Sequence, residues 1–147
     1  MERLRYGMVG GAVGAYIGDT HRYGAQMDHL AELAAGCFSR DYEKSMKTAR
    51  IWKLEDTSRI YRDYREMAEK EAAREDGIDF VSIVTPNVSH YEIAKCFLEQ
   101  GIHVVCDKPV AMNVQQAQEL KDLAEKQGPA FRRDLRLYGL SGHPTGA

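Results

Sequence analysis

The chain has 147 residues and a formal net charge of −2, with 44% hydrophobic and 29% charged residues. This length and balance are typical of one globular domain with its own core. The small net charge gives no reason to expect nucleic-acid or membrane-surface binding. No apolar run reaches the ~20 residues of a membrane-spanning helix, and no signal-peptide pattern precedes the first expected strand.

The cysteines predict a reducing environment. They are odd in number, have no C-x-x-C spacing and lie in apolar stretches, at Cys37, Cys96 and Cys106. Free buried thiols are therefore favoured over disulfides or metal ligands, and we expect a cytoplasmic protein. The histidines His21, His29, His103 and His143 show no metal-ligand spacing, so no metal site is predicted.

In chain order, residues 4–9 predict a strand, and residues 15–28 predict a helix. The turn between them is rich in glycine: Gly10, Gly11, Ala12, Val13, Gly14, Ala15. A strand, a glycine turn and a helix form the context of the dinucleotide fingerprint G-x-G-x-x-G/A. Gly10 fits the first position, and Ala15 fits the third, where a small residue allows close packing. Ala12 takes the second, where glycine usually lets the backbone approach a pyrophosphate. A plain flexible turn is the alternative.

Residues 33–38 predict a second strand, followed by Ser39, Arg40 and Asp41. In a dinucleotide fold this strand end faces the adenosine ribose. A hydroxyl and a guanidinium suit a 2′-phosphate, which favours NADP. NAD stays open because Asp41 could reach the ribose, and Arg40 could equally be a solvated turn residue.

The middle of the chain predicts a helix over residues 42–54, a very short third strand near residues 60–61 and a helix over residues 63–74. In the last helix, inward positions are expected at Tyr64, Met67, Ala68 and Ala72. Its mixed charges are interpreted as a solvated face: Glu66, Glu69, Lys70, Glu71.

Residues 80–84 are mostly β-branched and apolar, as expected for a parallel strand covered on both faces. A helix over residues 91–100 follows and closes at Gly101, and residues 102–105 predict the next strand. Asn113 is the expected N-cap of a helix over residues 114–127. Polar clusters end the two strands: Thr85, Pro86, Asn87 and Asp107, Lys108, Pro109. Ligands of open α/β sheets bind beyond such strand ends.

Alternating strands and helices predict an α/β fold with a doubly wound parallel sheet, Rossmann-like, in a single domain over residues 1–128. Residues 129–147 predict an irregular or disordered tail.

Three segments together resemble the Gfo/Idh/MocA oxidoreductases, relatives of glucose–fructose oxidoreductase and inositol dehydrogenase. They are V-G-G-A-V-G-A-Y-I-G, D-G-I-D-F-V-S-I-V-T-P-N-V-S-H and G-I-H-V-V-C-D-K-P-V, and the resemblance covers about residues 3–128. It implies the NAD(P)-binding half of an enzyme that moves hydride between the nicotinamide and a sugar or polyol carbon. Many relatives have glutamate where this chain has Asp107.

The resemblance also implies roles for single residues. The turn from Gly10 to Gly14 would cradle the pyrophosphate, and Thr85 with Pro86 would flank the adenosine side. Asn87 and His90 would lie toward the nicotinamide ribose. Lys108, between Asp107 and Pro109, would be catalytic by stabilising alkoxide charge at the substrate oxygen. The alternatives are a purely structural His90 and a solvated Lys108.

Relatives continue into a substrate domain and a sixth strand, which residues 129–147 do not resemble. One codon choice for residues 131–142 encodes F-G-V-T-Y-G-Y-T-G-Y-P in the adjacent frame, similar to the family's next segment. This leads to the hypothesis of a frameshifted, truncated product, against a genuine short protein. Strand 102–105 would then be an unpaired edge through which a homo-oligomer could form. A non-catalytic dinucleotide-binding module and an inert fragment remain the alternatives to an enzyme.

Overall fold

The computed structural model describes residues 3–127, and the tail with its frameshift hypothesis lies outside this part. Four parallel strands form one sheet in the order β2-β1-β3-β4. The strands are β1 (Leu4–Gly10), β2 (Ala31–Cys37), β3 (Phe80–Val84) and β4 (His103–Cys106). The α-helices are α1 (Tyr16–Gln26), α2 (Tyr42–Ile51), α3 (Tyr64–Ala73), α4 (His90–Glu99) and α5 (Val114–Lys126). Short 3₁₀ turns are η1 (Met27–His29), η2 (Thr57–Arg59) and η3 (Asn87–Ser89).

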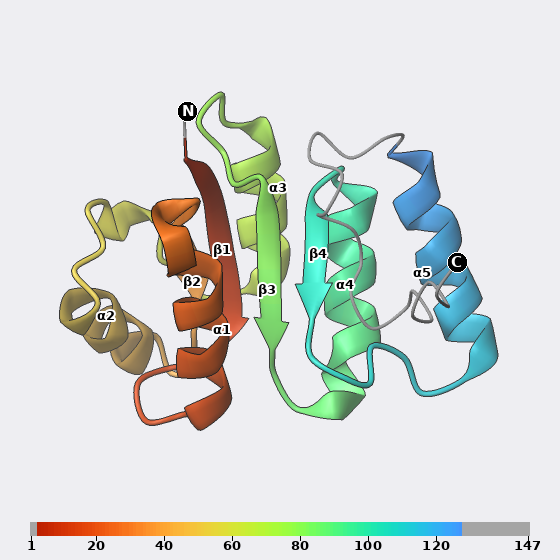
Figure 1. Cartoon of the computed structure of the whole chain (residues 1–147), viewed down its shortest axis with the longest axis horizontal. Coiled ribbons are helices and arrows are strands. Elements are labelled where there is room, and N and C mark those ends of the chain that lie inside the picture. Colours follow the sequence, from red (N-terminus) through yellow and green to blue (C-terminus); the bar gives the residue numbers. More distant parts are fainter. Residues whose placement is uncertain (1–2, 128–147) are drawn as a thin grey trace.

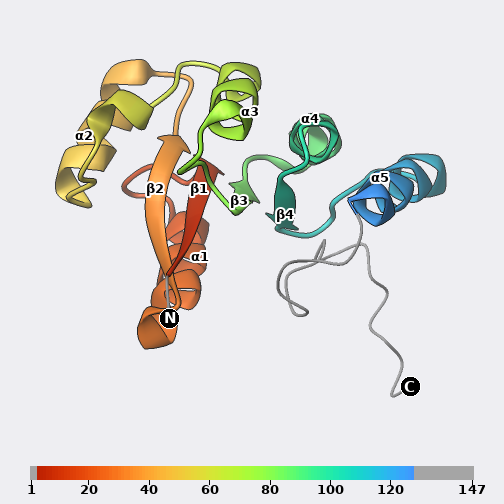
Figure 2. The same cartoon turned by 90° about the horizontal axis from the view of Figure 1, so that it is seen from above.

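Helices cover both faces of the sheet, which confirms the doubly wound α/β prediction (Figures 1 and 2). α1 lies on one face, α3 and α4 lie on the other, and α5 packs outside α4. Because successive side chains of a strand point to opposite faces of the sheet, the apolar core is divided between the two faces. In β1, Tyr6 and Met8 belong to the apolar cluster that includes Phe38 and Phe80, whereas Val9 belongs to the cluster with Val81 and the inner face of α4. All five residues of β3 are buried, as expected for a strand between two layers.

The sequence predicted the ends of most helices and strands to within a few residues. Asn113 caps α5 by accepting from the Gln116 backbone N–H at 2.8 Å, and Gly101 closes α4 with a φ of 81°. Both predictions are confirmed. β2 begins at Ala31, two residues earlier than expected, and α2 ends at Ile51 rather than at residue 54.

The predicted third strand is reduced to a single bridge between Gly36 and Ile60, where the Tyr61 N–H donates to the Gly36 carbonyl at 2.8 Å. The residues before it form η2 instead. Asp56 caps this turn, because its carboxylate accepts from the Ser58 N–H at 2.9 Å. The local cap therefore competes with an extended backbone and leaves room for only one bridge.

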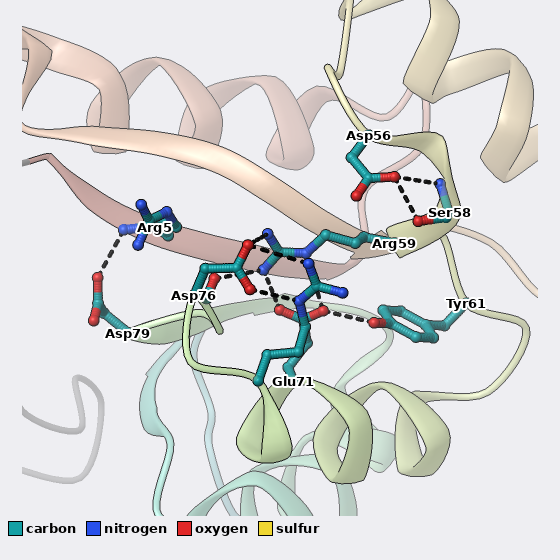
Figure 3. Close-up of polar contacts among 9 residues, drawn as sticks. Arg5, Asp56, Ser58, Arg59, Tyr61, Glu71, Asp76 and Asp79 are labelled. Carbon is teal, nitrogen blue, oxygen red and sulfur yellow. Dashed lines mark hydrogen bonds and ion pairs between the residues drawn. The ribbon is translucent and has the colours of Figure 1, made fainter.

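Glu71 was expected on the solvated face of α3, and this prediction is wrong. Its exposed fraction is 1%, and Arg59, at 5%, donates to both of its carboxylate oxygens (Figure 3). The Tyr61 hydroxyl donates to the same carboxylate at 2.6 Å. Because a buried carboxylate is tolerated when it is paired and hydrogen-bonded, Glu71 can lie inside, and Ala72 is exposed in its place.

Candidate functional site

The predicted polar clusters meet at the carboxyl edge of the sheet. Gly10 at the end of β1 is in register with Val84 at the end of β3, and Ile83 is in register with Cys106 of β4. The Asp107 N–H donates to the Ile83 carbonyl at 3.1 Å, which fixes the start of the loop after β4. The glycine turn, residues 85–87 and residues 107–109 therefore leave neighbouring strands at one edge.

The glycine turn needs its glycines. Gly10, Gly11 and Gly14 have φ values of 82°, 74° and 96°, a region that side chains rarely adopt. A Cβ at Gly10 would lie 2.9 Å from the Thr85 methyl carbon, whereas one at Gly14 would meet nothing within 4 Å. The Ala12 side chain is 6% exposed and belongs to the apolar core cluster that contains Met8. Its methyl group thus packs inward, and Gly14 is the open side of the turn.

Gly18, rather than Ala15, makes the close contact between α1 and the turn. A Cβ at Gly18 would lie 2.3 Å from the Gly11 carbonyl oxygen, whereas Ala15 is the N-cap residue of α1. The sequence prediction missed Gly18. Glycine is a poor helix former, so a glycine near the start of an expected helix was the signal that could have found it.

The N-terminus of α1 has no side-chain cap, since Ala15 offers no acceptor. α2, α3 and α5 are capped by Asp41, Asp63 and Asn113. In the turn, the Val13 N–H donates to the buried Thr48 hydroxyl of α2 at 3.2 Å, which ties the turn to its neighbour helix. An uncapped helix N-terminus behind an open turn carries N–H groups and a partial positive charge suited to an anion.

The end of β2 presents a cation to solvent. Arg40 is exposed, whereas the Asp41 carboxylate accepts from the Glu43 N–H at 3.0 Å as the cap of α2. The Ser39 hydroxyl accepts from the Asp41 N–H at 3.1 Å, so it too is engaged locally. Of the three residues that were predicted to face a ribose, Arg40 is the one without such a local bond.

His90 links the two loops that follow β3 and β4. Its side chain is fully buried, with Nδ1 at 2.6 Å from the Pro109 carbonyl oxygen and Nε2 at 2.6 Å from the Thr85 carbonyl oxygen. Around it, Thr85 is half-buried, and the exposed residues of these loops include Pro86, Asn87, Lys108 and Pro109. The geometry gives His90 a structural position between the loops, and a contact of its ring with a cofactor stays a prediction.

His21 of α1, to which the sequence assigned no role, lies with Nδ1 at 2.7 Å from the Ser82 hydroxyl of β3. Burial lowers the pKa of His21, and the nearby Asp107 carboxylate opposes that shift. Strand and helix are 61 residues apart here, so no local pattern could reveal the pair.

The three cysteines are free thiols, as predicted; Cys37 and Cys106 are buried and Cys96 is half-buried. Burial raises the pKa of Cys37 to about 11 and of Cys106 to about 12, which leaves both as unreactive thiols. Within residues 3–127, no three His, Cys, Asp or Glu side chains gather as metal ligands would. None of the helices described there has the length and apolarity to span a membrane.

Comparison with known proteins gives a family and close structural relatives. Residues 4–133 match the Gfo/Idh/MocA model, described as an oxidoreductase family with an NAD-binding Rossmann fold. The uncharacterised oxidoreductase YfiI of Bacillus subtilis is 44% identical over 141 residues, which are 95% of this chain and 35% of that protein.

Two solved structures superpose well. An oxidoreductase from Pseudomonas syringae has a TM-score of 0.83 and 43% identity, covering 86% of this chain and 34% of its own. An inositol dehydrogenase homologue from Azotobacter vinelandii, solved with NAD⁺, has a TM-score of 0.82 and 38% identity, covering 86% and 32%. This chain thus spans about a third of the length of these relatives. Together with the glycine turn at the sheet edge, these matches show that the chain belongs to the Gfo/Idh/MocA oxidoreductase family, of which it carries the NAD-binding Rossmann fold.

Proposed function

We propose that this chain is the cofactor-binding part of an oxidoreductase that moves hydride between the nicotinamide of NAD(P) and a hydroxyl or keto carbon of a sugar or polyol. The observation that carries the proposal is the meeting of the glycine turn with the two polar loops, residues 85–87 and 107–109, at the sheet edge where the uncapped α1 begins. The Azotobacter relative, solved with NADH and myo-inositol, supports the class of substrate.

In this proposal the turn from Gly10 to Gly14 binds the pyrophosphate through backbone N–H groups and the α1 dipole. Thr85 and Pro86 flank the adenosine side, and Asn87 lies toward the nicotinamide ribose. His90 contributes by holding the loops after β3 and β4 together. Asp107 and Pro109 set the position of Lys108 between them.

Lys108 is the proposed catalytic residue. Its side chain is exposed at the end of β4, where it can face a bound substrate. An ammonium group there would stabilise the alkoxide that is left when the hydroxyl proton departs, and this alkoxide becomes the keto carbonyl as hydride leaves the carbon for the nicotinamide. Chemistry at this position needs the substrate pocket, which other parts of a longer protein would supply.

For the cofactor we favour NADP over NAD. Arg40 and Asp41 are both exposed after β2, but the Asp41 carboxylate is engaged as the cap of α2, which leaves the Arg40 guanidinium as the charge available to a ligand. A carboxylate directed at the ribose would select the free 2′-hydroxyl of NAD, whereas a guanidinium suits the 2′-phosphate.

Fluorescence titration of the chain with NADPH and NADH tests the proposal. Binding of either cofactor, weakened when Gly14 is replaced by a bulky residue such as Val, is the expected result, because a side chain at the open turn would block the pyrophosphate. Binding without turnover when a substrate domain is supplied would favour a non-catalytic module. No binding of either cofactor would overturn the proposal in favour of an inert fragment.

A further inference from the structure

A second arginine reaches the carboxyl edge of the sheet beside Arg40. Ile60 bridges Gly36 in parallel, and the Tyr61 N–H donates to the Gly36 carbonyl. Residues 60–62 therefore run alongside the end of β2, in the same direction. Arg62 comes out at the edge where β2 passes into Ser39 and Arg40, although the two arginines are far apart in sequence.

The Arg62 side chain is held at this edge by an aromatic ring. Its guanidinium carbon lies 3.9 Å from the ring centroid of Tyr42, the first residue of α2 and two residues after Arg40. Cation–π stacking of this kind orients a guanidinium while leaving its N–H groups available to an anion.

Arg62 differs from the other cations around it in how its charge is paired. Arg62, Lys70 and Arg74 line one cavity of about 440 Å³, together with Tyr42 and Tyr61. Lys70 pairs with Glu66 at 2.7 Å, and Arg74 pairs with Asp76 at 2.8 Å. Arg62 is exposed and has no carboxylate partner within residues 3–127. It is therefore the cation of this cavity whose charge is left for a ligand.

We infer that Arg62 is a specificity-determining residue that binds the 2′-phosphate of a dinucleotide together with Arg40. This inference rests on the proposed function and extends it to a residue outside the β2 end. A 2′-phosphate is a monoester with about two negative charges, and the Arg62 guanidinium on the Tyr42 ring, together with that of Arg40 two residues before Tyr42, matches it better than one guanidinium. The free 2′-hydroxyl of NAD gives neither arginine a charge to bind.

The test compares NADPH with NADH, and 2′,5′-ADP with 5′-AMP, by calorimetric titration of the 147-residue chain. In Arg62→Gln we expect NADPH and 2′,5′-ADP to bind about tenfold more weakly, which is the size of one lost charge-assisted hydrogen bond. The affinity for NADH should change by less than about twofold. Arg62→Lys, which keeps the positive charge but lacks the planar guanidinium group, should lose less of the affinity for NADPH. Lys70→Gln is the matched control, since it removes a charge from the same cavity and should leave the NADPH to NADH ratio unchanged.

The outcomes separate this inference from the function on which it rests. If the unaltered chain binds neither cofactor, the proposed function fails and the inference fails with it. If the chain binds a dinucleotide but Arg62→Gln leaves the NADPH to NADH ratio unaltered, or Lys70→Gln alters it equally, the inference alone is overturned. Because Arg62 is exposed, thermal unfolding by circular dichroism should show the same midpoint for all variants.

Discussion

Glu71 shows how one buried charge fixes the region where a strand was expected. The Arg59 guanidinium donates to its carboxylate and to the Asp76 carbonyl, and the Tyr61 hydroxyl donates to the same carboxylate. Burial and this hydrogen bond raise the pKa of Tyr61, so the hydroxyl stays protonated and remains a donor. One carboxylate therefore joins the single bridge of residues 60–61 to α3.

We predict that Glu71→Gln lowers the free energy of unfolding by about 3 kcal/mol, because it removes the buried carboxylate that pairs with Arg59 and leaves that guanidinium only the exposed Asp76 carboxylate at 3.8 Å. Tyr61→Phe should cost about 1 kcal/mol, the size of one hydrogen bond. Urea denaturation measures both changes. Glu69→Gln on the exposed side of α3 is the control, and an equal effect of Glu69→Gln and Glu71→Gln would contradict the prediction.

His21 predicts a dependence of stability on pH. Because burial lowers its pKa in the folded protein, the unfolded chain binds a proton more readily below the ordinary value of 6.5. Stability is therefore fully present above that value and falls as the pH drops toward the lowered pKa. The pKa of His103 is lowered by burial as well, so it adds to the same slope.

Unfolding free energies at about pH 7.5 and about pH 5.5 should differ less in His21→Gln than in the unaltered chain. The control His29→Asn changes an exposed histidine in η1. A slope that is the same in all three proteins would show that His21 does not contribute.

The positions of single residues at the candidate site were predictable where the neighbouring residues in the sequence carried the signal. Runs of polar residues directly after apolar strands placed Thr85 to Asn87 and Asp107 to Pro109 at the strand ends. The pairs Arg59–Glu71 and His21–Ser82 were not predictable, because each joins two different elements, 12 and 61 residues apart, and depends on how those elements pack. Glu71 in particular has the spacing of a surface charge, and only its partner explains its burial.

At the scale of elements, the contact of α1 with the glycine turn gives a third prediction. In an exposed helix, Gly→Ala is stabilising by up to about 1 kcal/mol. At Gly18 the added Cβ would lie 2.3 Å from the Gly11 carbonyl oxygen, and backbone cannot yield as a flexible side chain can. Gly18→Ala should therefore destabilise the protein and also weaken dinucleotide binding, because α1 must move off the turn.

Gly24→Ala is the matched control, on the same helix but with nothing within 4 Å of its added Cβ. We expect it to raise the thermal midpoint slightly and to leave binding unchanged. If both substitutions raise the midpoint, then α1 does not depend on the close approach at Gly18.

Helices and strands were predictable wherever the apolar residues of a segment followed one clear pattern. Residues 80–84 match β3 at both ends, because a β-branched run bounded by polar residues leaves little choice. The strand prediction within residues 56–61 failed for the opposite reason. Their strand signal is two residues long, and the Asp56 cap, which uses a single side chain, is enough to turn the backbone into η2.

At the scale of the molecule, the alternation of strands and helices predicted a doubly wound parallel sheet, since right-handed crossovers leave few arrangements. In the described part of the chain, β4 is the last strand of the sheet. Pairing of a second copy along β4 stays a prediction, which sedimentation across a range of concentrations would test. The individual substrate was not predictable from this chain, which spans about a third of the length of its relatives.

The test of Lys108 uses a chimera, because this chain spans about a third of the length of its relatives and the proposed turnover requires a substrate pocket. Residues 1–127 can be joined to the remainder of the Azotobacter inositol dehydrogenase homologue, whose matching part is 38% identical. In this chimera, with myo-inositol and NAD(P), Lys108→Ala should lower kcat by about 100-fold or more, because a general acid–base group typically contributes that much. NADH affinity should change by less than about threefold, since the pyrophosphate site on α1 is untouched. Lys121→Ala, an exposed lysine of α5, is the control and should leave both quantities unchanged. A loss of kcat matched by an equal loss of NADH affinity would mean that Lys108 holds the cofactor rather than acting on the substrate.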